Sequence, residues 1–188
     1  MITAGDFRKG LIFKMDGEIY EVIDFQHVKP GKGAAFVRTK YRNIKTGATV
    51  ERSFNPNEKY EEGEIQMKDM SYIYNEGDLY YFMDTETYEQ VPVHKELIGE
   101  DALRFLKENM VCKVYSNDGS IYNVELPTFV EMAITQCDPA VKGNTAQNAT
   151  KTATIETGAV IRVPLFVSSD DIIRIDTRTG EYADRVKQ

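Results

Sequence analysis

The sequence contains one short segment whose residue types and spacing present a distinctive reactive group. It is the run Lys29-Pro30-Gly31-Lys32-Gly33, which lies between two segments with β-strand patterns. Pro30 fixes its own backbone angle, while glycines adopt conformations closed to other residues, so the run predicts a tight turn with the Lys32 ammonium at its tip. The plainer interpretation is an ordinary solvated hairpin turn. A Walker phosphate loop is excluded, because G-x-x-x-x-G-K-[ST] is absent and no helical pattern follows.

The remaining reactive residue types do not form a recognisable catalytic or metal-binding motif. His27 and His94 lack the H-E-x-x-H spacing, and Cys112 and Cys137, 25 positions apart, form no C-x-x-C pair. We expect reduced, buried thiols, with a disulfide as the less favoured alternative. There is no G-x-S-x-G nucleophile motif. We therefore expect neither an enzyme nor a bound cofactor or metal, although an enzyme that uses Lys32 or a carboxylate pair remains an alternative.

The charge of the chain is unevenly distributed along the sequence. Lys plus Arg number 23 and Asp plus Glu 30, a net charge of −7, which argues against a protein that coats nucleic acid indiscriminately. Between His27 and Arg52, however, there are seven basic residues and one acid, or +6, against −13 elsewhere. This asymmetry predicts a basic lobe that faces a polyanion, while the rest of the surface is repelled.

Composition and apolar patterning indicate a folded protein outside the membrane. Hydrophobic residues make up 41% of the 188 residues and charged residues 28%, as in ordinary globular chains. No apolar stretch approaches the roughly 20 residues that a bilayer crossing needs, and charged residues interrupt any secretory pattern near the N-terminus. We expect a cytoplasmic protein.

Strand patterns predominate in the elements that must position the Lys32 turn. The first unit combines four expected strands and turns at Asp16-Gly17 and Thr46-Gly47, which suggests an SH3-like barrel over residues 1–63. Its expected strands are 7–15, 18–28, 34–42 and 49–54.

Two further units follow, and each is expected to form a small barrel. Residues 64–127 combine strands at 64–74, 79–83, 88–91, 111–116 and 120–125 with a single helix at 97–109, a pattern typical of an OB barrel. Residues 128–188 contain strands at 129–137, 152–156, 160–167, 172–176 and 181–186. The expected fold class is all-β, with three small barrels.

Several motifs together give the chain a family resemblance. They are Phe25-Gln26-His27-Val28-Lys29-Pro30-Gly31-Lys32-Gly33-Ala34-Ala35-Phe36, Asp6-Phe7-Arg8, Leu126-Pro127, Asp138-Pro139 with Lys142-Gly143, Val163-Pro164-Leu165-Phe166 and Gly180-Glu181-Tyr182 with Arg185-Val186. On these residues, which span essentially the whole chain, the sequence resembles bacterial elongation factor P.

The resemblance implies a fold, a partner and a set of contact residues. The fold would be an N-terminal SH3-like, KOW-type domain and two OB domains in an L-shaped, tRNA-like arrangement. Such a factor binds the ribosome between the peptidyl and exit sites and promotes peptide-bond formation at consecutive prolines. Residues 29–33 would approach the CCA end of peptidyl-tRNA, with Lys32 modified by a partner enzyme. The implied ribosome contacts are Gly143, Asn144, Thr145, Tyr182 and Arg185.

Within this resemblance some questions remain open from the sequence. Asn144 stands where the family commonly has Asp, which leaves hydrogen bonding available but removes a charge. The resemblance fits a monomer without membrane contact, and it does not specify the chemistry of the Lys32 modification. An elongation-factor-P-like paralogue and a generic OB-fold protein that binds single-stranded RNA are the alternative functions.

Overall fold

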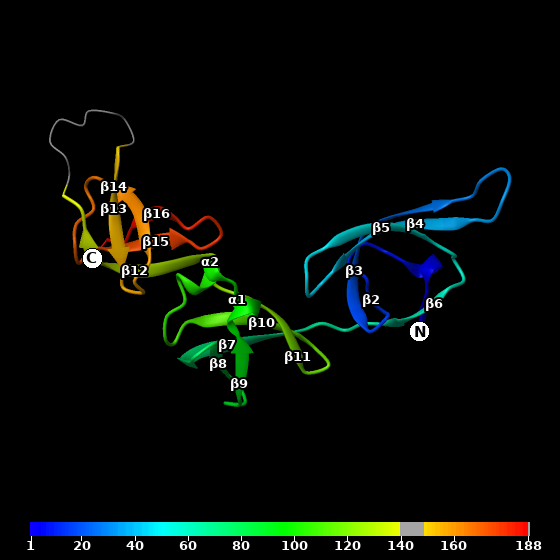
Figure 1. The fold of residues 1–188 in the computed structure, drawn as a ribbon, viewed down its shortest axis with the longest axis horizontal. Coiled ribbons are helices and arrows are strands. Elements are labelled where there is room, and N and C mark those ends of the chain that lie inside the picture. Colours follow the sequence, from blue (N-terminus) through cyan, green and yellow to red (C-terminus); the bar gives the residue numbers. More distant parts are fainter. Residues whose placement is uncertain (140–148, 188) are drawn as a thin grey trace. The chain divides into compact units, whose positions relative to one another are not determined.

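The computed structural model describes residues 1–139 and 149–187, and these residues are mostly β-strand (Figure 1). They form two compact units, the first made of residues 1–67 and 115–123, the second of residues 68–114 and those from 124 onward. Within the described ranges, no helix is long and apolar enough to cross a membrane.

The first unit contains a six-stranded antiparallel sheet in the order β1-β6-β2-β3-β4-β5. Its strands are β1 (Ile2–Thr3), β2 (Ile12–Met15), β3 (Glu18–Val28), β4 (Phe36–Asn43), β5 (Thr49–Phe54) and β6 (Lys59–Glu62). Asp16 and Gly17 join β2 to β3 with φ values of 53° and 79°, the positive angles of a type I′ hairpin turn. The expected hairpins are therefore present, and the sheet gains β1 and β6, which the strand patterns did not predict.

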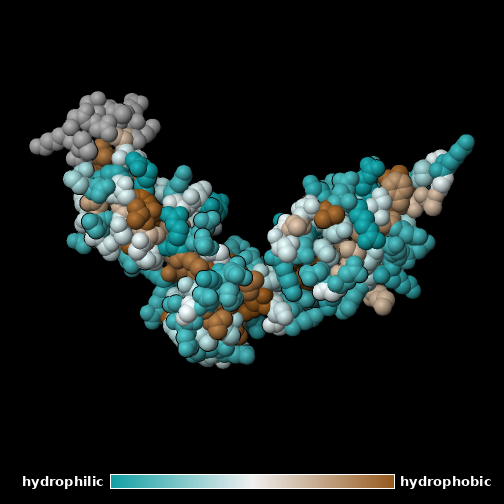
Figure 2. Space-filling model, in the orientation of Figure 1, coloured by the Kyte–Doolittle hydropathy of each residue, from teal (hydrophilic) through white to brown (hydrophobic). Residues whose placement is uncertain are grey.

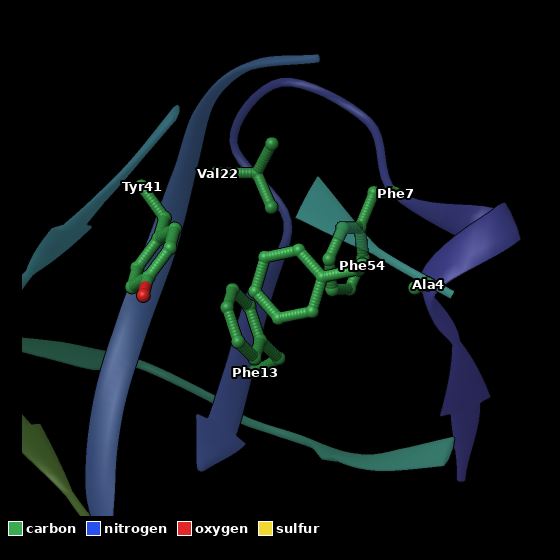
Figure 3. Packing of buried hydrophobic residues seen from close by; sticks show 6 residues of the cluster. All are labelled: Ala4, Phe7, Phe13, Val22, Tyr41 and Phe54. Carbon is green, nitrogen blue, oxygen red and sulfur yellow. The ribbon is translucent and has the colours of Figure 1, made fainter. Parts of the chain in front are cut away.

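A cluster of aromatic residues fills the interior of this unit (Figure 3). The Phe13 ring lies 4.8 Å from that of Phe7 and 5.9 Å from that of Tyr41, measured between centroids. Phe7, Phe13 and Phe54 are at most 1% exposed. Truncation of one such ring to alanine typically costs about 3–5 kcal/mol, so these side chains hold the barrel that carries the β3–β4 hairpin.

The hairpin formed by β3 and β4 contains a β-bulge. Val22 pairs with Tyr41 and Asp24 with Lys40, which leaves Ile23 as an extra residue in β3. Paired residues lie on the same face of a sheet, so Val22 and Phe25 share the face of their partners Tyr41 and Thr39, which are buried. In a regular strand two residues three positions apart would lie on opposite faces, and the bulge is what brings Val22 and Phe25 to the same one. Asp24 and Lys40 consequently lie on the outer face.

The second sheet has five strands in the order β11-β10-β7-β8-β9. These are β7 (Gln66–Glu76), β8 (Leu79–Asp84), β9 (Gln90–His94), β10 (Val111–Asn117) and β11 (Ser120–Glu125). The tip of the β10–β11 hairpin belongs to the first unit, where the Lys14 ammonium lies 2.8 Å from an Asp118 oxygen and 3.0 Å from a Glu61 oxygen. The Asn117 amide also donates to the Glu64 carbonyl at 2.6 Å. These contacts fasten the hairpin tip to β2, β6 and the segment after β6.

The single long helix expected over residues 97–109 was wrong. The structure has two one-turn helices, α1 (Lys95–Ile98) and α2 (Glu100–Leu103), separated by Gly99 at φ 85° and ψ 149°. After α2 ends at Leu103 the chain continues as turns and loop, and Asn109 has φ 69°. Of the apolar face that the spacing predicted, Ala102, Leu103, Phe105 and Leu106, the structure buries Phe105 and Leu106 and leaves the other two half-buried. One residue with extended, positive-φ backbone is enough to break helical hydrogen bonding.

The third sheet lies in the second unit, in the order β14-β13-β12-β15-β16. Its strands are β12 (Phe129–Cys137), β13 (Thr150–Ile155), β14 (Val160–Pro164), β15 (Ile172–Asp176) and β16 (Glu181–Arg185). The two edge strands, β14 and β16, contact each other, so the sheet curls around its core. Met132, Ile155, Val163 and Ile173 are fully buried there.

Both cysteines are free, in agreement with the expectation of reduced thiols. Cys112 is buried in the second sheet, and burial raises the pKa of its thiol to about 12. Cys137, expected to be buried, is only half-buried, and its sulfur lies 3.6 Å from the Ser169 hydroxyl oxygen.

Candidate functional site

The Lys32 turn is the end of the long β3–β4 hairpin. Strand pairing continues to Val28 opposite Phe36, and residues 29–35 form an exposed loop beyond it. Gly33 has φ 106°, a backbone conformation that side chains with a Cβ rarely adopt, whereas Gly31 has no positive φ. In Figure 2 the end of this hairpin stands clear of its barrel as a hydrophilic tip.

The two lysines of this loop are exposed and unpaired within the part of the chain that the structure describes. Neither Lys29 nor Lys32 forms a hydrogen bond or an ion pair with a described residue. No described acid or base approaches Lys32 closely enough to exchange protons with it. The loop therefore offers exposed ammonium groups for contact with a partner.

The arm below the loop is stiffened by packing around Phe25. The Arg8 guanidinium carbon lies 5.3 Å from the Phe25 ring centroid, and the His27 ring packs edge-on at 5.6 Å. Arg8 also donates to the Phe7 carbonyl at 2.6 Å. His27 thus packs against Phe25 on the exposed arm, and no carboxylate among the described residues forms an ion pair with it.

The outer face of the hairpin is less basic than the count over residues 27–52 predicts. Arg42 pairs with Glu21 at 2.6 Å and Arg38 lies 3.9 Å from Glu51. Glu21 and Asp24 precede the counted window in sequence but lie directly across from the basic strand β4. Residues 1–63 carry eleven basic and nine acidic side chains, a net charge of +2. The excess positive charge therefore lies in the loops, at Lys29, Lys32 and Lys45, rather than on the strands.

The predicted C-terminal contact residues are brought together around an exposed aromatic side chain. The Arg185 guanidinium carbon lies 5.1 Å from the Phe166 ring centroid, and the Tyr182 ring packs edge-on to Phe166 at 6.5 Å. Phe166 is 59% exposed, and Arg185 also lies 3.7 Å from Asp171. Burial, with the nearby Asp184 carboxylate, raises the pKa of Tyr182.

The other predicted contacts, Gly143, Asn144 and Thr145, lie outside the described residues. Phe166 is the member of the C-terminal cluster that the sequence did not indicate as a site residue. The expected strand over residues 160–167 included Phe166, whereas the structure ends β14 at Pro164 and places Phe166 in the turn that follows. Over the described ranges, no group of three or more His, Cys, Asp or Glu side chains could hold a metal ion.

Comparison with protein families accounts for all three parts of the chain. Residues 3–60 match the elongation factor P KOW-like domain, residues 65–124 the elongation factor P OB domain, and residues 130–185 the elongation factor P C-terminal domain. The chain belongs to the elongation factor P family. It is therefore a translation elongation factor, and its all-β class with KOW-like and OB domains is confirmed.

Individual relatives agree with this assignment over the full length. Elongation factor P of Acetivibrio thermocellus is 61% identical over 186 residues, which cover 99% of this chain and all of that protein. Elongation factor P of Ruminiclostridium cellulolyticum is 60% identical over 187 residues, with both chains fully covered. Among solved structures, a translation initiation factor eif-5a family protein from Naegleria fowleri has a TM-score of 0.54 at 17% identity, covering 66% of this chain and 96% of that one. That likeness concerns the fold alone.

Proposed function

We propose that this elongation factor P binds the ribosome between the peptidyl and exit sites, contacts peptidyl-tRNA and promotes peptide-bond formation at consecutive prolines. The observation that carries the proposal is the exposed loop of residues 29–33, in which Lys32 has no partner among the described residues. Membership of the family supplies the process in which the loop acts.

The factor assists the reaction without catalysing it. Proline reacts slowly because its ring constrains the attacking nitrogen, so holding the end of the peptidyl-tRNA in a productive pose lowers an orientational barrier. Lys32 would touch the CCA end and the ribosome would perform the chemistry. An exposed loop without a desolvating pocket or a paired base suits positioning better than proton transfer.

Several features belong to the same proposal. A partner enzyme modifies Lys32, which lengthens its side chain, and the factor acts as a cytoplasmic monomer without a cofactor. The proposed domains are 1–63, 64–127 and 128–188. Ribosome contacts come from Gly143, Asn144, Thr145, Tyr182 and Arg185. The cluster of Tyr182, Arg185 and exposed Phe166 supports the last assignment, because aromatic rings and arginine are suited to stacking on RNA bases.

Replacement of Lys32 tests the proposal directly. In cells that lack the native factor, Lys32→Ala should fail to restore synthesis of a reporter that contains three consecutive prolines. Lys45→Ala, which removes the same charge from the β4–β5 turn of the same barrel, should restore it fully. Equal protein levels are verified by immunoblotting, and intact-mass spectrometry of the native factor measures the Lys32 modification. Undiminished rescue by Lys32→Ala contradicts the proposal.

A further inference from the structure

A pocket in the second unit is lined by two arginines that form no ion pair with a described carboxylate. It has a volume of about 450 Å³ and lies beside α2, against β13, β14 and the first residue of β16. Its lining includes Arg104, Arg162, Thr152, Gly180 and Glu181. Neither arginine forms an ion pair within residues 1–139 and 149–187, whereas Arg174, Arg178 and Arg185 of the same unit all do.

Neutral contacts hold the Arg104 side chain in place. Its Nη2 donates to the Val160 carbonyl at 3.2 Å, and its guanidinium carbon lies 5.1 Å from the Phe105 ring centroid. The turn at Gly180 packs closely against this pair, since a Cβ built there would lie 3.5 Å from both Arg104 Nη1 and Phe105 Cζ. The guanidinium is thus fixed in orientation while Nε and Nη1 remain available as donors.

Arg162, on β14, is likewise held by neutral contacts. Its Nε donates to the Thr150 hydroxyl at 2.8 Å and its Nη2 to the Thr150 carbonyl at 3.3 Å, so Nη1 stays available. Thr152 pairs directly with Arg162 across the β13–β14 ladder, and its hydroxyl forms no hydrogen bond with a described residue. Glu181 reduces the charge of the lining from two positive charges to a net of one.

We propose that this pocket binds a phosphate group of an RNA backbone. Two orientated guanidinium groups and a hydroxyl can donate hydrogen bonds to the oxygens of a phosphodiester. The Val160 carbonyl and the Thr150 oxygens that hold the arginines are neutral, so they do not cancel the charge of the guanidinium groups. The lining contains no aromatic ring on which a base could stack, so recognition is independent of base sequence. The choice of RNA as the partner rests on the proposed function.

Nuclear magnetic resonance on the full chain tests whether the pocket binds phosphate. The Nε–Hε signals of Arg104 and Arg162 should shift in a saturable way with inorganic phosphate and, at lower concentration, with an oligouridine RNA. The signal of Arg174, which is paired with Asp184 at 3.3 Å, should not. Shifts with inorganic phosphate but none with RNA would establish a small-anion site and overturn the proposal, as would no shift with either.

Salt-dependent ribosome binding tests the same pocket in its proposed setting. Arg162→Gln should weaken binding about tenfold, the effect of one charged hydrogen bond. The slope of log K against log salt should fall by about 0.7 to 0.9. Arg174→Gln removes the same charge from the same sheet and should change neither, while Arg162→Lys, which keeps the charge, should retain most of the slope. Equal behaviour of Arg162→Gln and Arg174→Gln contradicts the proposal.

The two proposals can fail separately. If Lys32→Ala leaves proline-reporter rescue intact while Arg104 and Arg162 respond to RNA, the proposed function fails and the phosphate pocket stands. If Lys32→Ala abolishes rescue while neither arginine responds, the function stands and the pocket proposal is wrong. Circular dichroism spectra of each variant confirm that the barrels are folded.

Discussion

At the residue scale, the presentation of Lys32 depends on one glycine more than on the other. Gly33 occupies φ 106°, where a side chain introduces strain, whereas Gly31 has neither a positive φ nor an atom within 4 Å of an added Cβ. Alanine at position 31 is therefore a control for alanine at position 33, because the two changes add the same methyl group to the same loop. The strain that an L residue meets at positive φ is about 1–2 kcal/mol, enough to shift an exposed loop to another conformation.

We predict that Gly33→Ala impairs proline-reporter rescue and that Gly31→Ala does not. The midpoint of thermal unfolding of Gly31→Ala should match that of the parent chain, and that of Gly33→Ala should fall by about 2–8 °C at most, the effect of about 1–2 kcal/mol of strain. Both variants should stay folded, because the loop contributes nothing to the aromatic core. Rescue by both variants at parental levels would contradict the assigned importance of the loop conformation.

Asp84 is a second residue whose surroundings determine its chemistry. It is 5% exposed, and its Oδ1 accepts the backbone N–H groups of Glu86 at 2.8 Å and Thr87 at 3.2 Å. These hydrogen bonds, with the Lys68 ammonium at 3.5 Å from Oδ2, lower the pKa of the Asp84 carboxyl.

We predict that Asp84 makes stability depend on pH below about 4. Because its pKa is lower in the folded than in the unfolded chain, the stabilisation is complete above the unfolded value of 3.8 and is lost as pH falls through the folded value. Asp84→Asn should therefore make the free energy of unfolding less dependent on pH in that range. Urea unfolding at pH 7, 5, 4 and 3 measures this free energy for both proteins. If it falls equally with pH in the two, Asp84 is not the group responsible.

The residue types predicted where the Lys32 loop lies, but the loop extends over residues 29–35 instead of forming a tight turn, and the aromatic contacts were predicted poorly. Lysine, proline and glycine each act locally, so Lys29-Pro30-Gly31-Lys32-Gly33 could be interpreted without knowing what surrounds it. The exposure of Phe166 and the burial of Asp84 depend on strands far away in the sequence. A phenylalanine in a β-rich chain is normally assigned to a core, and an aspartate in an acidic segment to a solvated face.

At the element scale, the strands with regular alternation were predicted most accurately. The bounds of β3, β5, β11, β12 and β15 agree with the expected ranges. β6 was missed because Lys59–Glu62 is charged except for Tyr60, and it forms a strand through pairing with β1 and β2. Its end also requires Gly63, where a Cβ would lie 2.6 Å from the Ile12 Cγ2 atom.

The attachment of the β10–β11 tip to the first unit was likewise invisible in the sequence. It depends on Lys14, whose pKa is raised by its hydrogen bonds to Asp118 and Glu61. An Asn-Asp-Gly turn predicts a hairpin but says nothing about what the hairpin touches.

We predict that Lys14→Ala frees this tip without unfolding the barrel. Amide hydrogen exchange over residues 115–123 should become faster, and the same change should follow from high salt in the parent chain, which screens exposed ion pairs. Lys9→Ala, which removes the 3.4 Å pair with Asp24 in the same barrel, is the matched control and should leave that exchange unchanged. Unaltered exchange in Lys14→Ala would mean that the tip is held by other contacts.

At the scale of the whole molecule, the positive charge of the N-terminal region is smaller in the folded sheet than the count over a stretch of sequence suggests. Counting from His27 to Arg52 gave +6, but the sheet places Glu21 and Asp24 opposite the basic strand. A sequence window cannot contain both partners of an antiparallel pair unless it spans the whole hairpin. The direction of the asymmetry remains, since residues 1–63 carry +2 and residues 64–188 carry −9. Its size was overestimated.

The bulge at Ile23 also determines how the length of the hairpin can change. Two residues added to each strand between the bulge and the loop would lengthen the arm by about 7 Å and leave Phe25 and Asp24 on their present faces. One residue added to β3 between Asp24 and Phe25 would place Phe25 on the outer face, whereas deletion of Ile23 itself would only remove the bulge and leave Asp24 opposite Lys40 and Phe25 opposite Thr39. Beyond the bulge, insertions and deletions should therefore be tolerated in steps of two per strand, and the distance from barrel to lysine should change in those increments.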